Sequence, residues 1–184
     1  SLDACEEAGI LPELTIEVHD LALEAAKQGA ELTKGEGRFL VVVQDNGPGI
    51  VKPQVPKIFG KLLYGSKFHR LKQSRGQQGI GISAAAMYGQ LTTGQPIRVT
   101  SRTGKGKPAH YFEIQIDTRK NNPVVTKDEQ LDDWHQEHGT RVELDHLGAT
   151  LLGMWVEITV TLAEVNGGAV AFDFTARDAV EQVA

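Results

Sequence analysis

Three short stretches of the chain combine glycines with polar side chains, a pattern that suits a ligand meeting exposed backbone. The first, Asp45-Asn46-Gly47-Pro48-Gly49, follows the apolar run 40–43. A carboxylate at the end of a buried strand can accept a hydrogen bond from the exocyclic amine of a base. Glycines beside it let a flat ring approach the backbone without meeting a Cβ. Because Asn-Gly and Pro-Gly are common turn dipeptides, a plain turn is the alternative for this stretch alone.

The second stretch, RGQQGIGIS, runs from Arg75 to Ser83. Its glycines lead into a helix predicted over 79–91, and the free N–H groups and positive dipole end of a helix start can bind an anion. A polar basic loop precedes it instead of a strand, and the lysine of a P-loop is missing. Neither a dinucleotide fingerprint nor a P-loop is therefore predicted. A glycine-rich helix start without a ligand is the alternative.

The third stretch is Gly139-Thr140, at the head of a strand predicted over 140–145. A threonine hydroxyl there could hold a base through water, and a simple strand start is the alternative. Nearby, His135 and His138 have a spacing that could ligate a metal. No third ligand stands near them in the sequence, so we predict a surface pair.

Composition indicates one ordinary globular domain. The 184 residues are 40% hydrophobic and 23% charged, with a net charge of −5 and a single cysteine, Cys5. The single cysteine suits a reducing compartment, and without a signal pattern or a long apolar run we expect a cytoplasmic protein and no membrane partner. The overall acidity argues against a domain built to hold nucleic acid. A local basic cluster is either a solvated loop or a cradle for polyphosphate: Lys61, Lys67, Arg70, Lys72 and Arg75.

Periodicity predicts the elements that position these stretches. Strands are expected at 13–21, 38–45, 96–102, 110–117, 140–145 and 154–162, and helices at 55–66 and 79–91. Residues 22–37 suit a short helix or a polar excursion, 65–78 a loop, and 121–139 a polar, peripheral segment with a solvated acidic loop at 128–133. Tyr64 and Phe68 are expected to pack rather than to stack on a base. Grouped helices and strand hairpins predict an α/β (α+β) two-layer sandwich with a mixed, mostly antiparallel sheet, and not a doubly wound fold.

The first residues, SLDACEEAG, predict a helix that is already under way. Leu2, Cys5 and Ala8 have helical spacing, and Gly9 provides the stop. The chain has no initiating methionine and no clear upstream cap, so we expect a fragment whose first helix has been cut. A complete helix with Ser1 as its N-cap is the alternative.

Taken together, these stretches resemble the GHKL ATPase family, whose Bergerat fold carries a first-helix Asn-x-x-Asp-Ala motif, D-x-G-x-G, a glycine-rich lid and a late Gly-Thr. They correspond here to SLDA, DNGPG, GQQGIG and GT. The segments SLDACEEAGILPE, FGKLLYGSKFHRLKQSRGQQGIGISAAAMYGQLTTGQP and YFEIQIDTRKNNP are similar to the B subunits of archaeal-type DNA topoisomerases of type IIB, the topoisomerase VI family. The similarity is dense over 1–123 and returns at EHGTRVELD. We expect an ATP-binding domain at 1–145 and leave 146–184 unassigned, as a sheet edge or an aberrant tail.

The resemblance implies an ATP site, residue by residue. Asp45 would bind the adenine amine, Gly47 and Gly49 would flank the base, and Asp3 and Thr140 would support its end of the pocket. Ser66 and Lys67 lie where the family's lid meets the nucleotide. The remaining candidates would wrap the phosphates with backbone N–H groups: Gly76, Gln77, Gln78, Gly79, Ile80, Gly81, Ile82 and Ser83.

The chain departs from the family pattern in three places. The asparagine that binds Mg²⁺ would stand immediately before Ser1, and the glutamate that activates water would stand further upstream. The lysine that a following transducer domain supplies to the γ-phosphate has no visible counterpart. We therefore expect no catalytic residue and no metal ligand in this chain. Loss of a general base costs about 10²- to 10⁴-fold in rate.

The resemblance also implies a function and partners. It implies an ATPase module that uses ATP and Mg²⁺, and that couples ATP-driven dimerisation to DNA strand passage and relaxation. The partners would be a DNA-cleaving A subunit, a second B subunit in an A2B2 heterotetramer, and double-stranded DNA through the whole complex. One alternative is a catalytically deficient nucleotide-binding fragment or regulatory homologue. Another is a histidine kinase or Hsp90-like chaperone, which the lid sequence disfavours.

Overall fold

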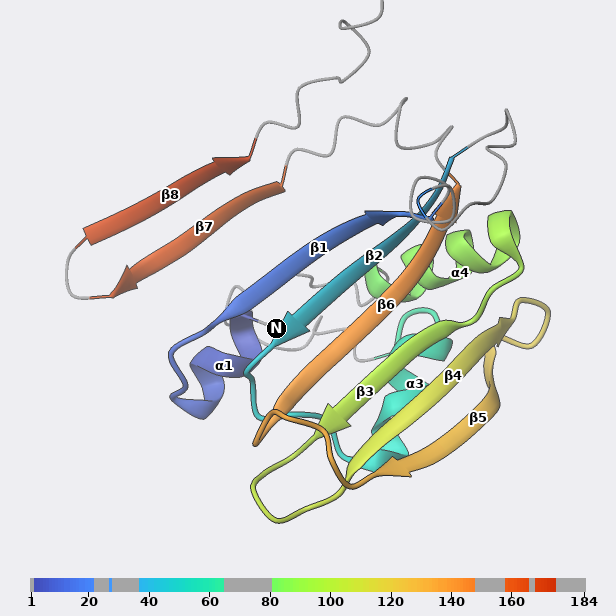
Figure 1. Ribbon diagram of the computed structural model, residues 1–184, viewed down its shortest axis with the longest axis horizontal. Coiled ribbons are helices and arrows are strands. Elements are labelled where there is room, and N and C mark those ends of the chain that lie inside the picture. The colour runs from blue at the N-terminus through green and yellow to red at the C-terminus, as the bar shows by residue number, and fades with distance from the viewer. Residues whose placement is uncertain are drawn as a thin grey trace, which may run out of the picture. The chain divides into compact units, whose positions relative to one another are not determined.

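The computed structural model contains two compact units, residues 1–147 and residues 148–184. It describes residues 2–21, 27, 37–64, 81–147, 158–165 and 168–174. The larger unit carries all of the candidate site residues, and Figure 1 shows its sheet with helices on one side. Among the described residues, no helix is both long and apolar enough to cross a membrane.

The larger unit is built on a six-stranded sheet in the order β1-β2-β6-β3-β4-β5 (Figure 1). All five pairings within it are antiparallel, which confirms the predicted, mostly antiparallel sheet. The strands are β1 (Leu14–Asp20), β2 (Arg38–Asp45), β3 (Ile97–Arg102), β4 (Ala109–Asp117), β5 (Asn122–Leu131) and β6 (Gly139–Leu147). Because β6 lies between β2 and β3 and runs antiparallel to both, its first residues lie beside the last residues of β2 and β3, at one end of the sheet.

One face of this sheet is covered by helices α3 (Val55–Gly60) and α4 (Gly81–Thr93). Apolar side chains that alternate along the strands form the core with these helices, at about 25 cal/mol for each Å² of apolar surface removed from water. The buried cluster consists of Val55, Phe59, Ala86, Ile97, Val99, Phe112, Ile114, Ile116, Val142 and Leu144. The predicted two-layer sandwich is therefore confirmed.

Helix α3 is shorter than the sequence predicts, since it ends at Gly60 rather than continuing to residue 66. The backbone leaves the helix because Gly60 packs tightly on the β4–β5 region, where an added Cβ would lie 2.6 Å from Pro123 Cβ. Asn121 then fixes the following turn, accepting from Leu62 N at 2.8 Å. Leu63 takes a positive φ of 63° in this turn. The apolar pattern of this segment continues past the point at which the helix stops.

Strand β5 corrects the prediction of a polar, peripheral segment at 121–139. Asn122–Leu131 pair along β4 as the edge of the sheet, and the acidic stretch predicted as a solvated loop begins inside this strand. Most β5 residues are exposed, so the strand has no apolar alternation to reveal it. Asp128 forms an ion pair with Lys52 at 3.0 Å instead of standing free in solvent.

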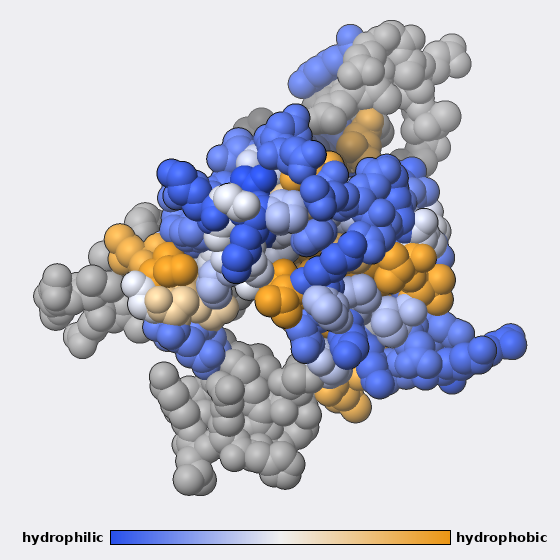
Figure 2. Space-filling view, turned by 90° about the horizontal axis from the view of Figure 1, so that it is seen from below, coloured by the Kyte–Doolittle hydropathy of each residue, from blue (hydrophilic) through white to orange (hydrophobic). Residues whose placement is uncertain are grey.

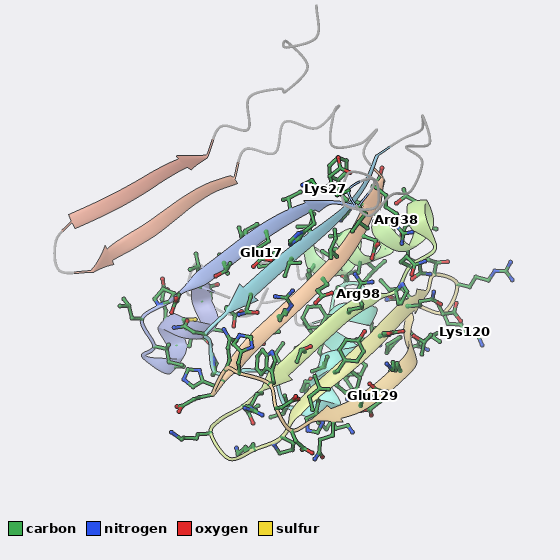
Figure 3. All side chains as sticks on the ribbon, viewed as in Figure 1. Glu17, Lys27, Arg38, Arg98, Lys120 and Glu129 are labelled. Atoms are coloured by element: carbon green, nitrogen blue, oxygen red, sulfur yellow. The ribbon has the colours of Figure 1, made fainter. Side chains whose placement is uncertain are left out.

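The opposite face of the sheet carries a network of charged side chains. Asp145, whose side chain is only 3% exposed, pairs with Arg38 at 2.8 Å and with Arg98 at 2.9 Å. Glu143 pairs with Arg98 at 3.1 Å and with Arg141 at 2.9 Å. Figure 3 labels Arg38 and Arg98 on this part of the sheet. The pairing of each carboxylate with two guanidinium groups allows charge to be held on a largely shielded sheet surface.

Two shorter pieces complete the description. Helix α1 (Leu2–Ala8) buries Cys5 and ends at Gly9, whose φ of 68° is the left-handed stop that the sequence predicts. In the smaller unit, β7 (Ile158–Val165) and β8 (Gly168–Phe174) form a two-stranded antiparallel sheet. Strand β7 confirms the strand predicted at 154–162 for residues 158–162, and residues 154–157 lie outside the described part.

Candidate nucleotide site

Four polar side chains from neighbouring strands form a row across one end of the sheet. Asp45 on β2 lies opposite Thr140 on β6, Thr140 lies opposite Ser101 on β3, and Ser101 lies opposite His110 on β4. Directly opposed residues point to the same face of a sheet. His110 alternates in step with the buried Phe112, so this row faces the helical side. This end of the sheet is thus polar on the helical side, next to the apolar core.

Asp45 is held in a fixed orientation by backbone groups. Its Oδ1 accepts hydrogen bonds from Gly47 N at 3.0 Å and from Thr140 N at 3.1 Å. Both bonds use the same oxygen, which leaves Oδ2 as the acceptor available to a ligand. A carboxylate prepared in this way can receive an exocyclic amine without first losing conformational freedom.

The glycines after Asp45 are required by close packing. Gly49 has a φ of 69°, and an added Cβ would collide with the carbonyl oxygen of Arg102. At Gly47, an added Cβ would lie 3.0 Å from Asp45 Oδ1 and 3.2 Å from Cys5 Sγ. Both glycines are therefore explained by neighbouring protein atoms in this structure, and their approach to a base stays a prediction.

Asn46 fastens this turn to the connection between α1 and β1, a role that the sequence does not reveal. Its Oδ1 accepts from Glu13 N at 2.8 Å and its Nδ2 donates to Leu11 O at 3.1 Å. The backbone adds a bond from Asn46 N to Glu13 O at 3.2 Å. The partners are backbone atoms, which no residue pattern marks. From the sequence, Asn46 is interpretable only as a turn residue.

His138 also belongs to this site and is not merely half of a surface pair. Its Nδ1 lies 2.9 Å from the carbonyl oxygen of Gly47. Because a carbonyl can only accept, the Nδ1 must carry the proton in this contact. His138 therefore holds the glycine turn from the side of β6, opposite the tether made by Asn46.

Helix α1 closes the site beneath the glycine turn. Cys5 is 1% exposed, and its Sγ lies 3.9 Å from Asn46 Oδ1. Burial, and then the nearby charge of Asp45, raise the pKa of the Cys5 thiol, so this cysteine stays protonated and unreactive near neutral pH. Asp3 lies on the same helix, half-buried, and its support of the base stays a prediction.

The other predicted contacts fall mainly on the lid. Ser66, Lys67 and residues 76–80 lie outside the described residues, as do Phe68 and all of the basic cluster except Lys61. Gly81, Ile82 and Ser83 form the first turn described in α4, where Gly81 is exposed and Ser83 is fully buried. The predicted contact of Ser83 with phosphate therefore stays a prediction, because the whole residue is buried here. Tyr64 donates to Gln54 at 2.6 Å, in keeping with a packing role.

The end of the molecule that carries this site is mainly hydrophilic. Figure 2 views the fold from that end, and it shows hydrophobic residues only in separate patches. Isolated exposed apolar residues include Leu11 and Val51, which are 72% and 55% exposed. The polar surroundings suit a charged, water-soluble ligand more than an apolar one.

A six-stranded antiparallel sheet, helices on one face and a glycine turn after a strand-end aspartate together define a nucleotide-binding fold of the GHKL type. The sequence model of the histidine kinase-, DNA gyrase B- and HSP90-like ATPases matches residues 4–120. This chain belongs to that family. The predicted family resemblance is confirmed.

Among its relatives are archaeal proteins that carry the name of the B subunit of type 2 DNA topoisomerase 6. The protein of Methanosarcina barkeri is 50% identical over 153 residues, which cover 83% of this chain and 22% of that protein. The protein of Methanococcoides burtonii is 46% identical over 187 residues, covering 94% of this chain and 28% of that protein. The chain thus spans only about a quarter of the length of these relatives.

Two further similarities were found. The fluoroacetyl-CoA-specific thioesterase family matches residues 124–184. That range includes β6 and most of β5, which the structure places in one sheet with β1–β4. A crystal structure of the N-terminal domain of a DNA repair protein is similar at a TM-score of 0.40 and 19% identity, covering 61% of this chain and 28% of that one.

Proposed function

We propose that residues 2–147 bind ATP with the adenine ring at Asp45. The observation that carries the proposal is the orientation of this carboxylate, whose Oδ1 is bonded to Gly47 N and Thr140 N. Its second oxygen can then accept the exocyclic amine of adenine, while the glycine turn lies against the ring. Thr140 Oγ1 lies 3.0 Å from Ser101 Oγ, so this hydroxyl is held on the strand residue that bonds Asp45 through its backbone N–H.

The same geometry implies selectivity for the base. Guanine presents a carbonyl oxygen where adenine presents its amine, and two acceptors facing each other leave a buried polar group unpaired. Such a mismatch costs about 1–3 kcal/mol, or roughly fivefold to 150-fold in affinity. We expect ATP and ADP to bind at least tenfold more tightly than GTP and GDP.

The decisive variant is Asp45→Asn. An amide can still accept both backbone bonds through its oxygen, but it turns an NH₂ group toward the adenine amine. We expect ATP affinity to fall at least a hundredfold, measured by calorimetry, while the melting temperature stays within a few degrees.

Asp117→Asn is the matched control. Asp117 also accepts two backbone N–H groups, from Arg119 at 3.0 Å and Lys120 at 3.1 Å, in the turn after β4. This variant should bind ATP normally. Equal ATP affinity of Asp45→Asn and the parent chain would refute the assignment.

The phosphate end of the site rests on family resemblance. The proposal assigns the segment 76–83 to the phosphates, through backbone N–H groups at the start of α4. Mg²⁺ would accompany the triphosphate and neutralise its charge. In the part of the chain that the structure describes, no three potential metal ligands lie together, so we assign no residue to the metal and no catalytic step to it.

We further propose that the chain is the nucleotide module of a type IIB topoisomerase B subunit. The support is 50% identity to such a subunit over 83% of the chain. ATP would act as a conformational ligand, closing two B subunits around DNA because it binds the closed state better. The A subunit, the A2B2 assembly, duplex DNA and a cytoplasmic location all belong to this proposal. A full-length B subunit that carries this chain as its nucleotide module should, together with an A subunit, give ATP-dependent relaxation of supercoiled DNA, and ATP-independent relaxation would contradict the proposal.

The alternative is a nucleotide-binding module without hydrolysis. ATP turnover should be compared between this chain and a version extended upstream by the family's first motif. Turnover by the extended version alone would show that binding and hydrolysis are separable here, whereas turnover by both would refute the alternative.

A further inference from the structure

The loop between β5 and β6 carries His138 to the glycine turn of the nucleotide site. Residues 132–138 form neither helix nor strand, so no ladder of backbone hydrogen bonds sets the position of this loop. At its end, His138 Nδ1 lies 2.9 Å from the carbonyl oxygen of Gly47. The place of His138 therefore depends on the contacts that the loop makes with other parts of the fold.

Arg102, the last residue of β3, supplies contacts that hold this loop. Its Nη1 donates to Trp134 O at 2.8 Å and to Gln136 O at 3.0 Å, and its Nη2 donates to Asp132 O at 3.3 Å. The guanidinium also lies over the Trp134 ring, 6.0 Å from its centroid. The three acceptors belong to alternate residues, and His138 is the next member of this series. One side chain thus fixes the loop up to the residues that lead into His138.

The backbone of Arg102 restrains the same glycine turn from another side. At Gly49, an added Cβ would collide with Arg102 O, so this carbonyl lies directly against the turn. Arg102 also pairs with Gly139 across β3 and β6, and Gly139 directly follows His138. The turn is therefore restrained at Gly49 by the backbone of Arg102 and at Gly47 by the loop that its side chain holds.

The glycine turn in its turn orients the carboxylate of Asp45. Gly47 N donates to Asp45 Oδ1 at 3.0 Å, while Gly47 O contacts His138, so both polar groups of Gly47 are held. We propose that Arg102 is a positioning residue of the nucleotide site, which places His138 and thereby fixes Gly47 and Asp45. This inference rests on the proposed binding of adenine at Asp45, and it adds a residue that touches neither the base nor the carboxylate.

The contact with the loop calls for an arginine rather than any cation. A guanidinium group presents its N–H donors in a rigid plane, and Arg102 uses two different nitrogens to reach three carbonyl oxygens. A lysine carries the same charge, but its donors lie on one flexible nitrogen. The Nε–H of Arg102 is buried without a partner among the described residues, and an unpaired buried donor destabilises a fold. The three bonds to the loop have to offset that loss.

The first measurement needs no nucleotide. The ring nitrogens of His138 are followed by nuclear magnetic resonance in the 184-residue chain at alkaline pH, where an imidazole ring carries one proton. We expect this proton on Nδ1, because the carbonyl oxygen of Gly47 can only accept. In Arg102→Lys, His138 should lose its preference for Nδ1. A proton on Nε2 in the parent chain, or unchanged His138 signals in Arg102→Lys, would overturn the inference.

The second measurement is calorimetry with ATP and with GTP. His138→Leu removes the donor and should weaken ATP binding about tenfold, because a binding group that loses its support is no longer held in the productive geometry. His138→Asn keeps an N–H donor near the position of Nδ1 and should bind ATP within about threefold of the parent. Arg102→Lys should weaken ATP binding at least fivefold. It should also lower the ratio of ATP to GTP affinity, which partial unfolding would leave unchanged because it reduces both affinities equally.

A double-mutant cycle tests whether Arg102 acts through His138. Arg102→Lys combined with His138→Leu should bind ATP within about twofold of His138→Leu alone, because both changes break one series of contacts. Additive losses would show that Arg102 acts by another route. Lys105→Gln is the matched control, since it removes an equal charge from the same hairpin and breaks the exposed pair of Lys105 with Glu137 of the same loop, at 2.6 Å. It should leave ATP affinity within about twofold of the parent.

An insertion keeps the inference testable if Arg102→Lys does not fold. Two glycines placed between Gln136 and Glu137 leave the bonds of Arg102 in place and free His138 from the held part of the loop. This variant should match His138→Leu in ATP affinity, and an affinity equal to that of the parent would refute the role of the loop. Loss of ATP binding in Asp45→Asn with normal binding in Arg102→Lys would overturn this inference alone. A parent chain that binds no ATP would overturn the proposed function, and the ring signals would still decide whether Arg102 places His138.

Discussion

A single carboxylate can select a base here because the surrounding backbone holds it still. A free aspartate must be ordered when a ligand binds, and each immobilised side chain costs about 0.5–1.5 kcal/mol. Asp45 has already met this cost in the folded protein through Gly47 N and Thr140 N. The neighbouring glycine turn is equally fixed, by Asn46 on one side and His138 on the other. Little of the free energy of binding is then needed to order the side chains that contact the base.

Gly49 allows a direct test of this rigidity. Gly49→Ala should destabilise the fold for two reasons: its φ of 69° is left-handed, which costs about 1–2 kcal/mol, and the new Cβ would collide with Arg102. Gly94→Ala is the matched control, because its φ is 72° and nothing lies within 4 Å of the added Cβ. In urea denaturation, Gly49→Ala should lose clearly more unfolding free energy than Gly94→Ala. Equal losses would mean that the turn can move away from Arg102.

The sequence could predict the residues that touch a ligand better than those that position them. Asp45, the glycines and Thr140 stand out because carboxylates and glycines in a motif suggest chemistry directly. Asn46 and His138 bond to backbone atoms 35 and 91 residues away, at Leu11 and Gly47. Such contacts exist only after the strands have assembled, and a backbone acceptor leaves no trace in residue type.

At the scale of elements, β6 serves both faces of the sheet. Its apolar Val142 and Leu144 pack under the helices, and the alternate residues Arg141, Glu143 and Asp145 carry the charged network. Burial by itself would raise the pKa of Glu143, but hydrogen bonds and charges from Arg141 and Arg98 outweigh it and lower that pKa. The contribution of this charged face to the stability of the fold should therefore depend on pH.

This linkage predicts an acid-sensitive contribution to stability. A carboxylate whose pKa is lowered by folding contributes its full stabilisation at pH values above its pKa in the unfolded chain, which is about 4.3 for glutamate. This contribution is lost as the pH falls through the lower pKa of the folded state. Glu143→Gln should therefore lower the unfolding free energy at pH 7, and its difference from the parent should shrink below about pH 4.3. Denaturation at several pH values measures this.

Glu137→Gln is the control for that experiment. Lys105 lowers the pKa of Glu137 through a hydrogen bond and its charge, but both side chains are largely exposed. Solvent screening makes such a pair contribute little. The control should show little pH-dependent difference. An unchanged difference for Glu143→Gln across this pH range would argue against the network.

The strands were predictable where apolar residues alternate or run together, and this includes β1, none of whose residues is buried. Strands β2, β3, β4 and β6 have buried apolar residues, and the sequence predicts all of them. Strand β5 was missed because as an edge strand it is exposed along most of its length. Helix α3 was overextended because its end is set by contacts of Gly60 and Leu62 with the β4–β5 turn, and not by its own pattern.

At the scale of the whole molecule, the chain divides into two units, and the observations on the nucleotide site concern only the larger one. All five pairings of the six-stranded sheet lie between Leu14 and Leu147, as do the described contacts of Asp45. Strands β7 and β8 pair only with each other among the strands that the structure describes. The thioesterase similarity over 124–184 crosses the boundary between these units. We therefore expect nucleotide binding to be a property of the larger unit.

A chain shortened to residues 1–147 tests this expectation. Removal of 148–184 breaks no strand pairing of the six-stranded sheet, so the shortened chain should retain its melting temperature within a few degrees. Its ATP affinity should stay within about twofold of the parent, because Asp45, Gly47, Asn46 and Thr140 keep all their described partners. Calorimetry and thermal unfolding measure both quantities. If ATP affinity fell tenfold while the sheet still unfolded cooperatively, residues 148–184 would have to contribute to the site. The proposed boundary of the nucleotide module would then have to move beyond Leu147.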